Sequence, residues 1–181
     1  MTVTLGVLMT AGLADEKSKP AKTLDGMPLI FEDNFETGTT KRWQPVSPEG
    51  WGIKHQNDDH VYSQHKNIKV KTPHRSPYNR SMIKDLYVSD FVLDVQLQST
   101  GRVYGHRDLC LFFGYQDPAH LYYVHLGKQM DDHANNTFIV NGADRTTIPT
   151  KTTPGTHSDA EWPHPRVVRN PSLIPNHPYR Q

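Results

Sequence analysis

The stretch FVLDVQLQ, residues 91–98, alternates apolar and polar side chains with a period of two. Phe91, Leu93 and Val95 fall on one side of an extended chain, while Asp94 and its neighbouring glutamines fall on the other. Successive side chains of a strand point to opposite faces, so this pattern predicts a strand with one buried and one solvated face. Such strands are typical of antiparallel sheets, because the strands of parallel α/β folds are covered on both faces.

A second pattern predicts a β-hairpin. Residues 108–115 (DLCLFFGY) and 120–126 (HLYYVHL) flank the segment 116–119, whose Asp-Pro pair is typical of a turn. Both alternating faces of the second arm carry bulky side chains, which predicts a central strand. Residues 136–141 (NTFIVN) lead into an Asn-Gly turn and predict a further strand, as does the alternation of residues 66–72 (KNIKVKT).

The chain of 181 residues suits one domain, and its 14 prolines and 12 glycines argue against long helices. We therefore expect an all-β, two-layer sandwich in residues 29–150. Residues 1–14 read as a signal peptide and are too short to span a bilayer, which takes about 20 apolar residues. Residues 15–28 read as a linker. Residues 151–181 read as an irregular tail, because proline removes the donor that a central strand needs. The expected location is secreted, periplasmic or on the cell surface, with no transmembrane span.

Charge and cysteine usage exclude some classes of function. With 20 basic and 19 acidic residues, the net charge is +1, which predicts no nucleic-acid partner. The single cysteine, Cys110, can form neither an internal disulfide nor a cysteine-based zinc site. Its apolar neighbours predict a buried structural thiol.

The phrase LIFEDNFETGTTKRWQP, residues 29–45, resembles the opening strand of concanavalin A-like jelly rolls, with its Phe-x-Asp-x-Phe motif followed by a tryptophan. Residues 89–127 resemble the middle of laminin-G-like domains and of the 3-keto-disaccharide hydrolase group. The resemblance implies a concanavalin A-like jelly-roll β-sandwich. The phrase EWPHPRVVRN, residues 161–170, is similar to a later strand of that fold but carries prolines, which implies a sandwich that is incomplete at its C-terminus.

The resemblance and the side chains together favour binding of a poly- or oligosaccharide. Sugars stack on aromatic rings, and polar side chains bind their hydroxyl groups. In the Pro-rich loop 72–80, Arg75 and Arg80 would meet acidic sugars, although a solvated loop is the simpler interpretation. Tyr123 and His125 are expected on a concave face. The candidate substrate-binding residues are Trp51, Tyr104, Arg107, Asp108, Tyr115, Tyr123 and His125.

Two other classes of function stay open. A glycan hydrolase needs two carboxyl groups across the scissile bond, about 5–5.5 Å apart or about 6.5–9.5 Å apart. The Glu-x-Asp-x-x-Glu strand of family 16 glucanases is absent, so a lyase that uses histidine, tyrosine and arginine competes with a hydrolase. A laminin-G-like protein-interaction domain is the third class. The catalytic candidates are His106, Arg107, Tyr123, His125 and Asp94.

The polar segment after the second hairpin arm contains a candidate metal site. Asp131 and Asp132 are adjacent, and Asn135 and Asn136 follow closely. Carboxylate and amide oxygens are ligands that Ca²⁺ prefers, so calcium is the possible cofactor. The alternative is a solvated loop.

Overall fold

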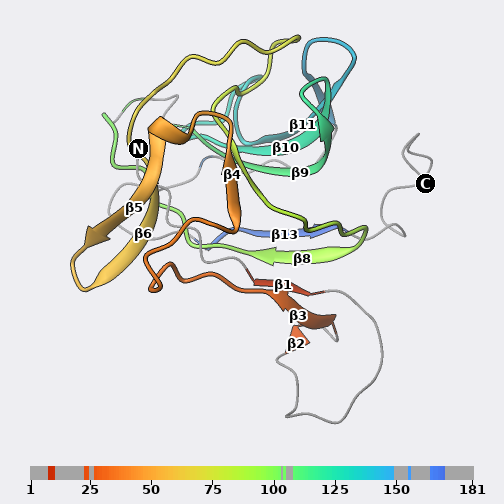
Figure 1. The fold of residues 1–181 in the computed structure, drawn as a ribbon. Helices are drawn as coiled ribbons and strands as arrows, with labels where there is room; N and C mark the ends of the chain where they lie inside the picture. The colour runs from red at the N-terminus through yellow and green to blue at the C-terminus, as the bar shows by residue number, and fades with distance from the viewer. Residues whose placement is uncertain are drawn as a thin grey trace.

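The structure, a computed structural model, describes residues 8–10, 23–24, 27–102, 104, 108–148, 155 and 164–169. Within these residues the chain is an antiparallel all-β sandwich, and its single helical turn is the 3-10 turn η1 (Pro48–Gly50). Figure 1 shows the two larger sheets with two short ribbons beside them. The all-β sandwich predicted from period-two alternation is confirmed.

The first sheet has the strand order β13-β8-β1-β3-β2. This sheet includes strands that lie outside residues 29–150, the range expected to form the sandwich. Most of segments 1–14 and 151–181 lies outside the described residues, and the signal peptide stays a prediction. The strands of this sheet are β1 (Leu8–Thr10), β2 (Thr23–Leu24), β3 (Met27–Phe31), β8 (Phe91–Asp94) and β13 (Arg166–Arg169).

The second sheet has the order β12-β11-β10-β9 and contains the predicted hairpin. β10 is a central strand, as its two bulky faces predict, and Tyr123 lies opposite both Phe112 and Phe138. The hairpin turn is tighter than expected, and Asp117 Oδ1 accepts a 2.6 Å hydrogen bond from the backbone N–H of Ala119. The strands are β9 (Leu109–Asp117), β10 (His120–Leu126), β11 (Asn136–Asn141) and β12 (Thr146–Ile148).

Two two-stranded ribbons and a long loop lie outside the two larger sheets. β4 (Trp43–Pro45) pairs with β7 (Ser81–Ile83), and β5 (Trp51–Gln56) pairs with β6 (Asp59–Gln64). The strand predicted at residues 66–72 is wrong, because residues 65–80 form an irregular loop. Residues 66–72 have no ladder partner among the described residues, and side-chain hydrogen bonds from Tyr78 to Asn67 and from Asn79 to the Lys66 carbonyl oxygen hold the loop instead.

The Phe-x-Asp-x-Phe motif stabilises the first part of the fold. Asp33 is buried, and its carboxylate accepts hydrogen bonds from the Phe35 backbone N–H (3.0 Å) and the Trp43 indole N–H (2.9 Å). These bonds hold Phe35 at a φ of 63°, a left-handed conformation that is unusual for a bulky residue. The rings of Phe31 and Phe35 each lie 5.8 Å from the Trp43 ring, so the motif forms an aromatic core.

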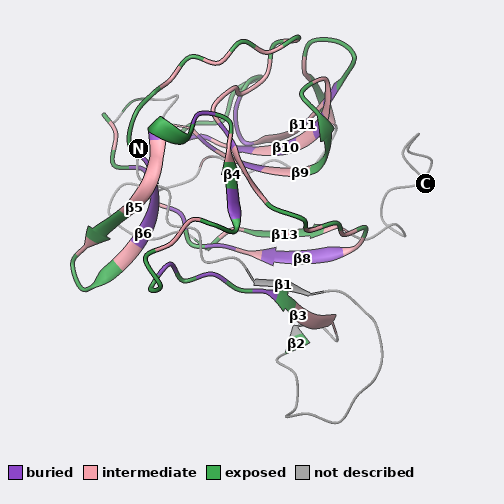
Figure 2. Cartoon of the chain, in the orientation of Figure 1, coloured by how far each residue is buried: buried purple, intermediate pink, exposed green. Residues whose placement is uncertain are grey.

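Both faces of the second sheet are packed, which positions the candidate site. One face contributes Leu109 and Leu111 to a core with Val95 and Leu97, and this burial confirms the alternation predicted for residues 91–98. The other face contributes a second core cluster, made of Leu121, Tyr123, Phe138 and Val140. Figure 2 shows β8 buried along most of its length and the loop 65–80 as largely a mixture of exposed and half-buried residues. The ring of His125 contacts Phe138 of this second cluster and lines a cavity.

Candidate functional site

A cleft of about 560 Å³ lies between the loop 65–80 and the face of the second sheet that carries His125. We call it the arginine cleft. Strands β5, β7, β9 and β10 contribute side chains to its wall, and so do the loop and the turn before β12. Its lining includes Trp51, Arg75, Arg80, Asp108, His125 and Arg145.

His125 is held at both edges of its ring. Its Nε2 lies 3.1 Å from Asp108 Oδ2, and its Nδ1 contacts the backbone carbonyl oxygen of His133. The residue is 4% exposed. Both ring nitrogens face oxygen atoms of the protein, so the ring lines the cleft without a free nitrogen directed at a ligand.

Gly127 lies in the turn that packs beside Asp108. A Cβ at position 127 would lie 2.7 Å from the Cβ of Ala134 and 3.4 Å from Asp108 Oδ1. The distance to Ala134 is too short for a side chain, so only glycine fits in this turn without a shift of its neighbours. The Gly127 N–H also donates a 3.1 Å hydrogen bond to Asn135 Oδ1, which fixes the same turn.

Tyr123 is a core residue whose hydroxyl reaches the cleft wall. Its ring is fully buried and stacks on Phe138 at 5.1 Å, so the ring face is not available to a sugar. The hydroxyl accepts a 3.1 Å hydrogen bond from Arg145 Nη1. Burial raises the pKa of Tyr123 to about 12, although the positive charges of Arg145 and Arg75 oppose that rise. Tyr123 therefore fixes the position of Arg145.

Trp51 joins the aromatic core to the cleft. Its ring lies 5.0 Å from the Tyr62 ring, and its Nε1–H donates a 2.9 Å hydrogen bond to Asn79 Oδ1. The same oxygen accepts a 2.7 Å hydrogen bond from Ser47 Oγ. Asn79 thus fixes the indole against the loop, and the half-buried Trp51 side chain forms part of the cleft wall.

Arg80 is the least expected residue of the cleft. It is 3% exposed, and its Nε and Nη1 atoms are buried without a hydrogen-bond acceptor among the described residues. Its guanidinium lies 5.3 Å from the centre of the Tyr115 ring, which gives a cation–π contact. A buried cation without a carboxylate is unfavourable, so this position needs a functional or structural explanation.

The structure places the remaining predicted residues elsewhere. Asp94 forms a bidentate ion pair with Arg166 across β8 and β13, at 2.7 and 3.0 Å, and does not line the cleft. Tyr104 is exposed and lies 5.3 Å from the Arg102 guanidinium. Tyr115 lines a second cavity. The candidates His106 and Arg107 lie outside the described residues.

The calcium candidates form a turn. Asp131 Oδ1 accepts a 2.7 Å hydrogen bond from the His133 backbone N–H, and Asp132 is exposed. Asn136 Nδ2 donates to the Asp131 carbonyl oxygen at 3.2 Å. Across the part of the chain that is described, no three His, Cys, Asp or Glu side chains are grouped to hold a metal ion.

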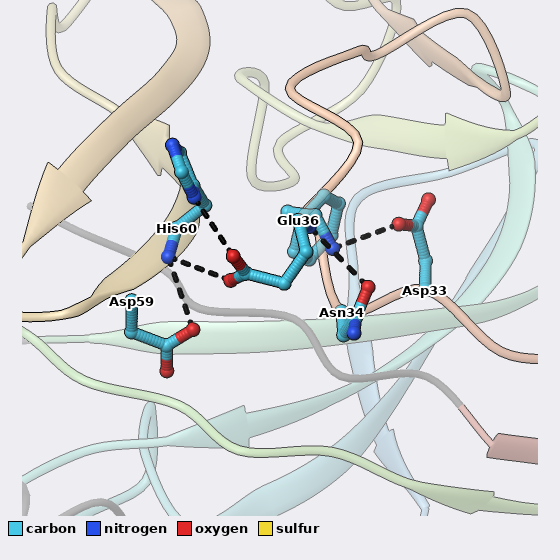
Figure 3. Close-up of polar contacts among 6 residues, drawn as sticks. Asp33, Asn34, Glu36, Asp59 and His60 are labelled. Carbon is cyan, nitrogen blue, oxygen red and sulfur yellow. Dashed lines mark hydrogen bonds and ion pairs between the residues drawn. The ribbon is translucent and has the colours of Figure 1, made fainter.

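A second polar cluster, which the sequence did not indicate, joins the turn after β3 to the tip of the β5–β6 hairpin (Figure 3). Glu36 accepts hydrogen bonds from the backbone N–H of His60 at 2.9 Å and from its Nδ1 at 3.0 Å. These bonds, and a contact with the Asp59 carboxyl group, lower the pKa of Glu36 to about 2. The neighbouring Glu36 in turn raises the pKa of the Asp59 carboxyl group. Because 24 residues separate Glu36 from His60, no local pattern predicts this cluster.

An apolar groove of about 1260 Å³ adjoins the arginine cleft, and Arg80 lines both. Its wall includes Phe113 and Tyr122, whose rings stack at 5.5 Å, and the exposed Tyr87 and Tyr115. Exposed apolar surface of this kind is where a protein partner would bind, if the laminin-G-like alternative holds.

Comparison with family models, with curated proteins and with solved structures finds no match for this chain. The concanavalin A-like resemblance therefore stays an expectation, and the fold itself supports only an all-β sandwich. No helix within the described residues is long and apolar enough to cross a membrane.

Proposed function

We propose that this chain is an exported carbohydrate-binding sandwich of the concanavalin A-like kind, and that the arginine cleft is its saccharide site. The single observation that carries the proposal is the make-up of the cleft. Its wall combines the indole of Trp51 and the phenol ring of Tyr78 with the cations Arg75 and Arg145. Rings stack on the apolar faces of sugars, and charged groups bind hydroxyl oxygens.

The size of the cleft agrees with this proposal. A volume of about 560 Å³ lies within the range of small-molecule sites, roughly 300–1,000 Å³. Three of the residues selected from sequence, Trp51, Asp108 and His125, line it together although they are far apart along the chain.

Binding to an immobilised glycan library, with and without calcium, tests the proposal. The cleft variant is Tyr78→Ala, whose side chain is half-buried in the wall and donates a 3.1 Å hydrogen bond to Asn67 Oδ1. The matched control is Tyr87→Ala, because Tyr87 is 91% exposed and lines the apolar groove only. We expect wild type and the control to bind the same glycans, and the cleft variant to bind them more weakly. Equal loss in both variants, or binding to no glycan, would contradict the proposal.

A glycan hydrolase or lyase is the second candidate, because the cleft wall holds a histidine and a carboxylate. Release of reducing ends or of unsaturated products from a bound glycan would support an enzyme. The engaged nitrogens of His125 favour binding over catalysis. We therefore expect neither product to accumulate above a protein-free control.

A further inference from the structure

The arginine cleft has an excess of positive charge that the whole chain lacks. Its lining contains Arg75, Arg80 and Arg145, against one carboxylate, Asp108, whose Oδ2 contacts His125. The net charge of the chain is only +1, so this excess is local. A cleft with one sign of charge raises the local concentration of ligands of the opposite sign.

We propose that the saccharide bound in this cleft is acidic, and that its carboxylate or sulfate group pairs with Arg80, Arg75 and Arg145. This inference rests on the proposed function and names the substrate class of the same site. Arginine suits the task, because its planar fork binds carboxylate and sulfate oxygens through two parallel hydrogen bonds.

The strongest support is Arg80. Arg80 is 3% exposed, and a buried guanidinium normally pairs with a carboxylate, but this one has two buried N–H donors without an acceptor among the described residues. Its one ring contact, with Tyr115, offers a π face rather than a hydrogen-bond acceptor. Because Arg80 lines the cleft, an anion bound there would supply the missing charge.

The other two arginines are held on the same side of the cleft by tertiary contacts. The Arg75 backbone N–H donates to Asp144 Oδ1 at 2.8 Å, and the Arg145 backbone N–H donates to the Arg75 carbonyl oxygen at 3.1 Å. Arg145 is also fixed by its bond to the Tyr123 hydroxyl and by the Phe138 ring, 5.0 Å from its guanidinium. The loop 65–80 and the turn before β12 therefore present two cations together.

Calorimetric titration of the full chain, at physiological ionic strength, tests the inference. The probes are a galacturonate trisaccharide with its neutral methyl ester, and a sulfated trisaccharide with its desulfated form. The two acidic probes separate carboxylate from sulfate as the recognised group. Inorganic sulfate and a single-stranded oligonucleotide of equal charge complete the set, because any basic surface attracts polyanions.

The variants are Arg80→Gln and Arg75→Gln, and the matched control is Arg102→Gln. Arg102 lies outside the cleft and contacts the Tyr104 ring at 5.3 Å, the same distance that separates Arg80 from Tyr115. Thermal unfolding checks that each variant folds. Arg75 is exposed, so its variant keeps the test valid if Arg80→Gln is unstable.

We expect at least one acidic probe to bind about tenfold or more tightly than its neutral form, because a charged hydrogen bond contributes about that factor. Both cleft variants should lose this preference, and the Arg102 control should keep it. Equal affinity for acidic and neutral probes would overturn the inference and leave the proposed function standing. Equal binding of the oligonucleotide would overturn it in favour of a general polyanion surface. Binding of no saccharide would overturn both proposals.

Discussion

Two histidine–carboxylate pairs of nearly equal N–O distance lie in different surroundings. His125 Nε2 and Asp108 Oδ2 are 3.1 Å apart, and His60 Nδ1 and Glu36 Oε2 are 3.0 Å apart. The side chains of the first pair are 5% and 32% exposed, and those of the second are 33% and 44% exposed. The first pair adjoins a cavity with three arginines in its wall, whereas the second ties a turn to a hairpin tip.

Because the two pairs differ in burial, a histidine–carboxylate contact alone does not identify a functional site. Water and salt screen an exposed pair, so it contributes little to stability and responds to ionic strength. A buried pair cannot exchange its partner for water, so loss of one member leaves the other unsatisfied. We therefore assign function from burial, neighbouring charge and adjoining cavity rather than from residue type.

The largest effect should come from removing the carboxylate that contacts the buried His125. Asp108→Ala leaves His125 Nε2 without its partner and opens space beside Gly127, so we expect a loss of roughly 2–4 kcal/mol of unfolding free energy. Urea denaturation measures the loss. The matched variant at the exposed pair, Glu36→Ala, should change the urea midpoint far less. Equal losses would show that burial does not distinguish the pairs.

A slightly smaller effect should follow from alkaline pH on the buried tyrosine beside the cleft. Burial raises the pKa of Tyr123 from 10.0 to about 12, so the folded protein keeps its proton while the unfolded chain loses it. The stability from this group is complete below pH 10 and is lost as pH rises towards 12, by on the order of 2 kcal/mol.

Tyr123→Phe should remove that part of the alkaline loss, as measured by thermal unfolding across the same pH range. Tyr62, whose pKa burial also raises to about 12, should account for a second loss of similar size that persists in this variant. An unchanged alkaline slope in Tyr123→Phe would contradict its burial.

A still smaller effect is expected from substituting Gly127, in the turn that packs beside Asp108. In Gly127→Ala the new methyl group meets the Ala134 side chain at 2.7 Å, so we expect a loss of about 1–2 kcal/mol and weaker saccharide binding. Gly101→Ala is the control, because a Cβ there meets nothing within 4 Å. Equilibrium unfolding and calorimetric titration give both numbers. Normal binding by a folded Gly127→Ala protein would show that the turn does not position the cleft wall.

The smallest effect belongs to the exposed pair. Hydrogen bonds from His60 lower the pKa of Glu36 from 4.5 to about 2, so its contribution is present above pH 4.5 and disappears as pH falls through 2. Glu36→Gln should lower the melting temperature slightly at neutral pH, and the difference should vanish near pH 2. High salt should also reduce it. A large, salt-independent difference would place this pair in the same class as the first.

The regular strands were predictable from sequence, but the cleft was only partly so. The hairpin at 108–126 and the alternating burial of residues 91–98 follow from side-chain periodicity and are confirmed, but the paired strand β8 ends at Asp94. The strand expected at 66–72 failed because local alternation does not say whether a ladder partner exists. Arg145 enters the site through its bond to the Tyr123 hydroxyl, a tertiary contact that no spacing along the chain specifies.

The indole N–H signals of the tryptophans test the central claim, that the arginine cleft is the ligand site, most directly. Trp51 Nε1 donates to Asn79 in the cleft wall, and Trp43 Nε1 donates to Asp33 in the core, each at 2.9 Å. The chain has three tryptophans, so Trp162→Phe leaves these two signals in a ¹⁵N-correlated NMR spectrum. Titration with the acidic trisaccharide should move the Trp51 signal and leave the Trp43 signal in place. Saturable binding that leaves the Trp51 signal unmoved would contradict the claim.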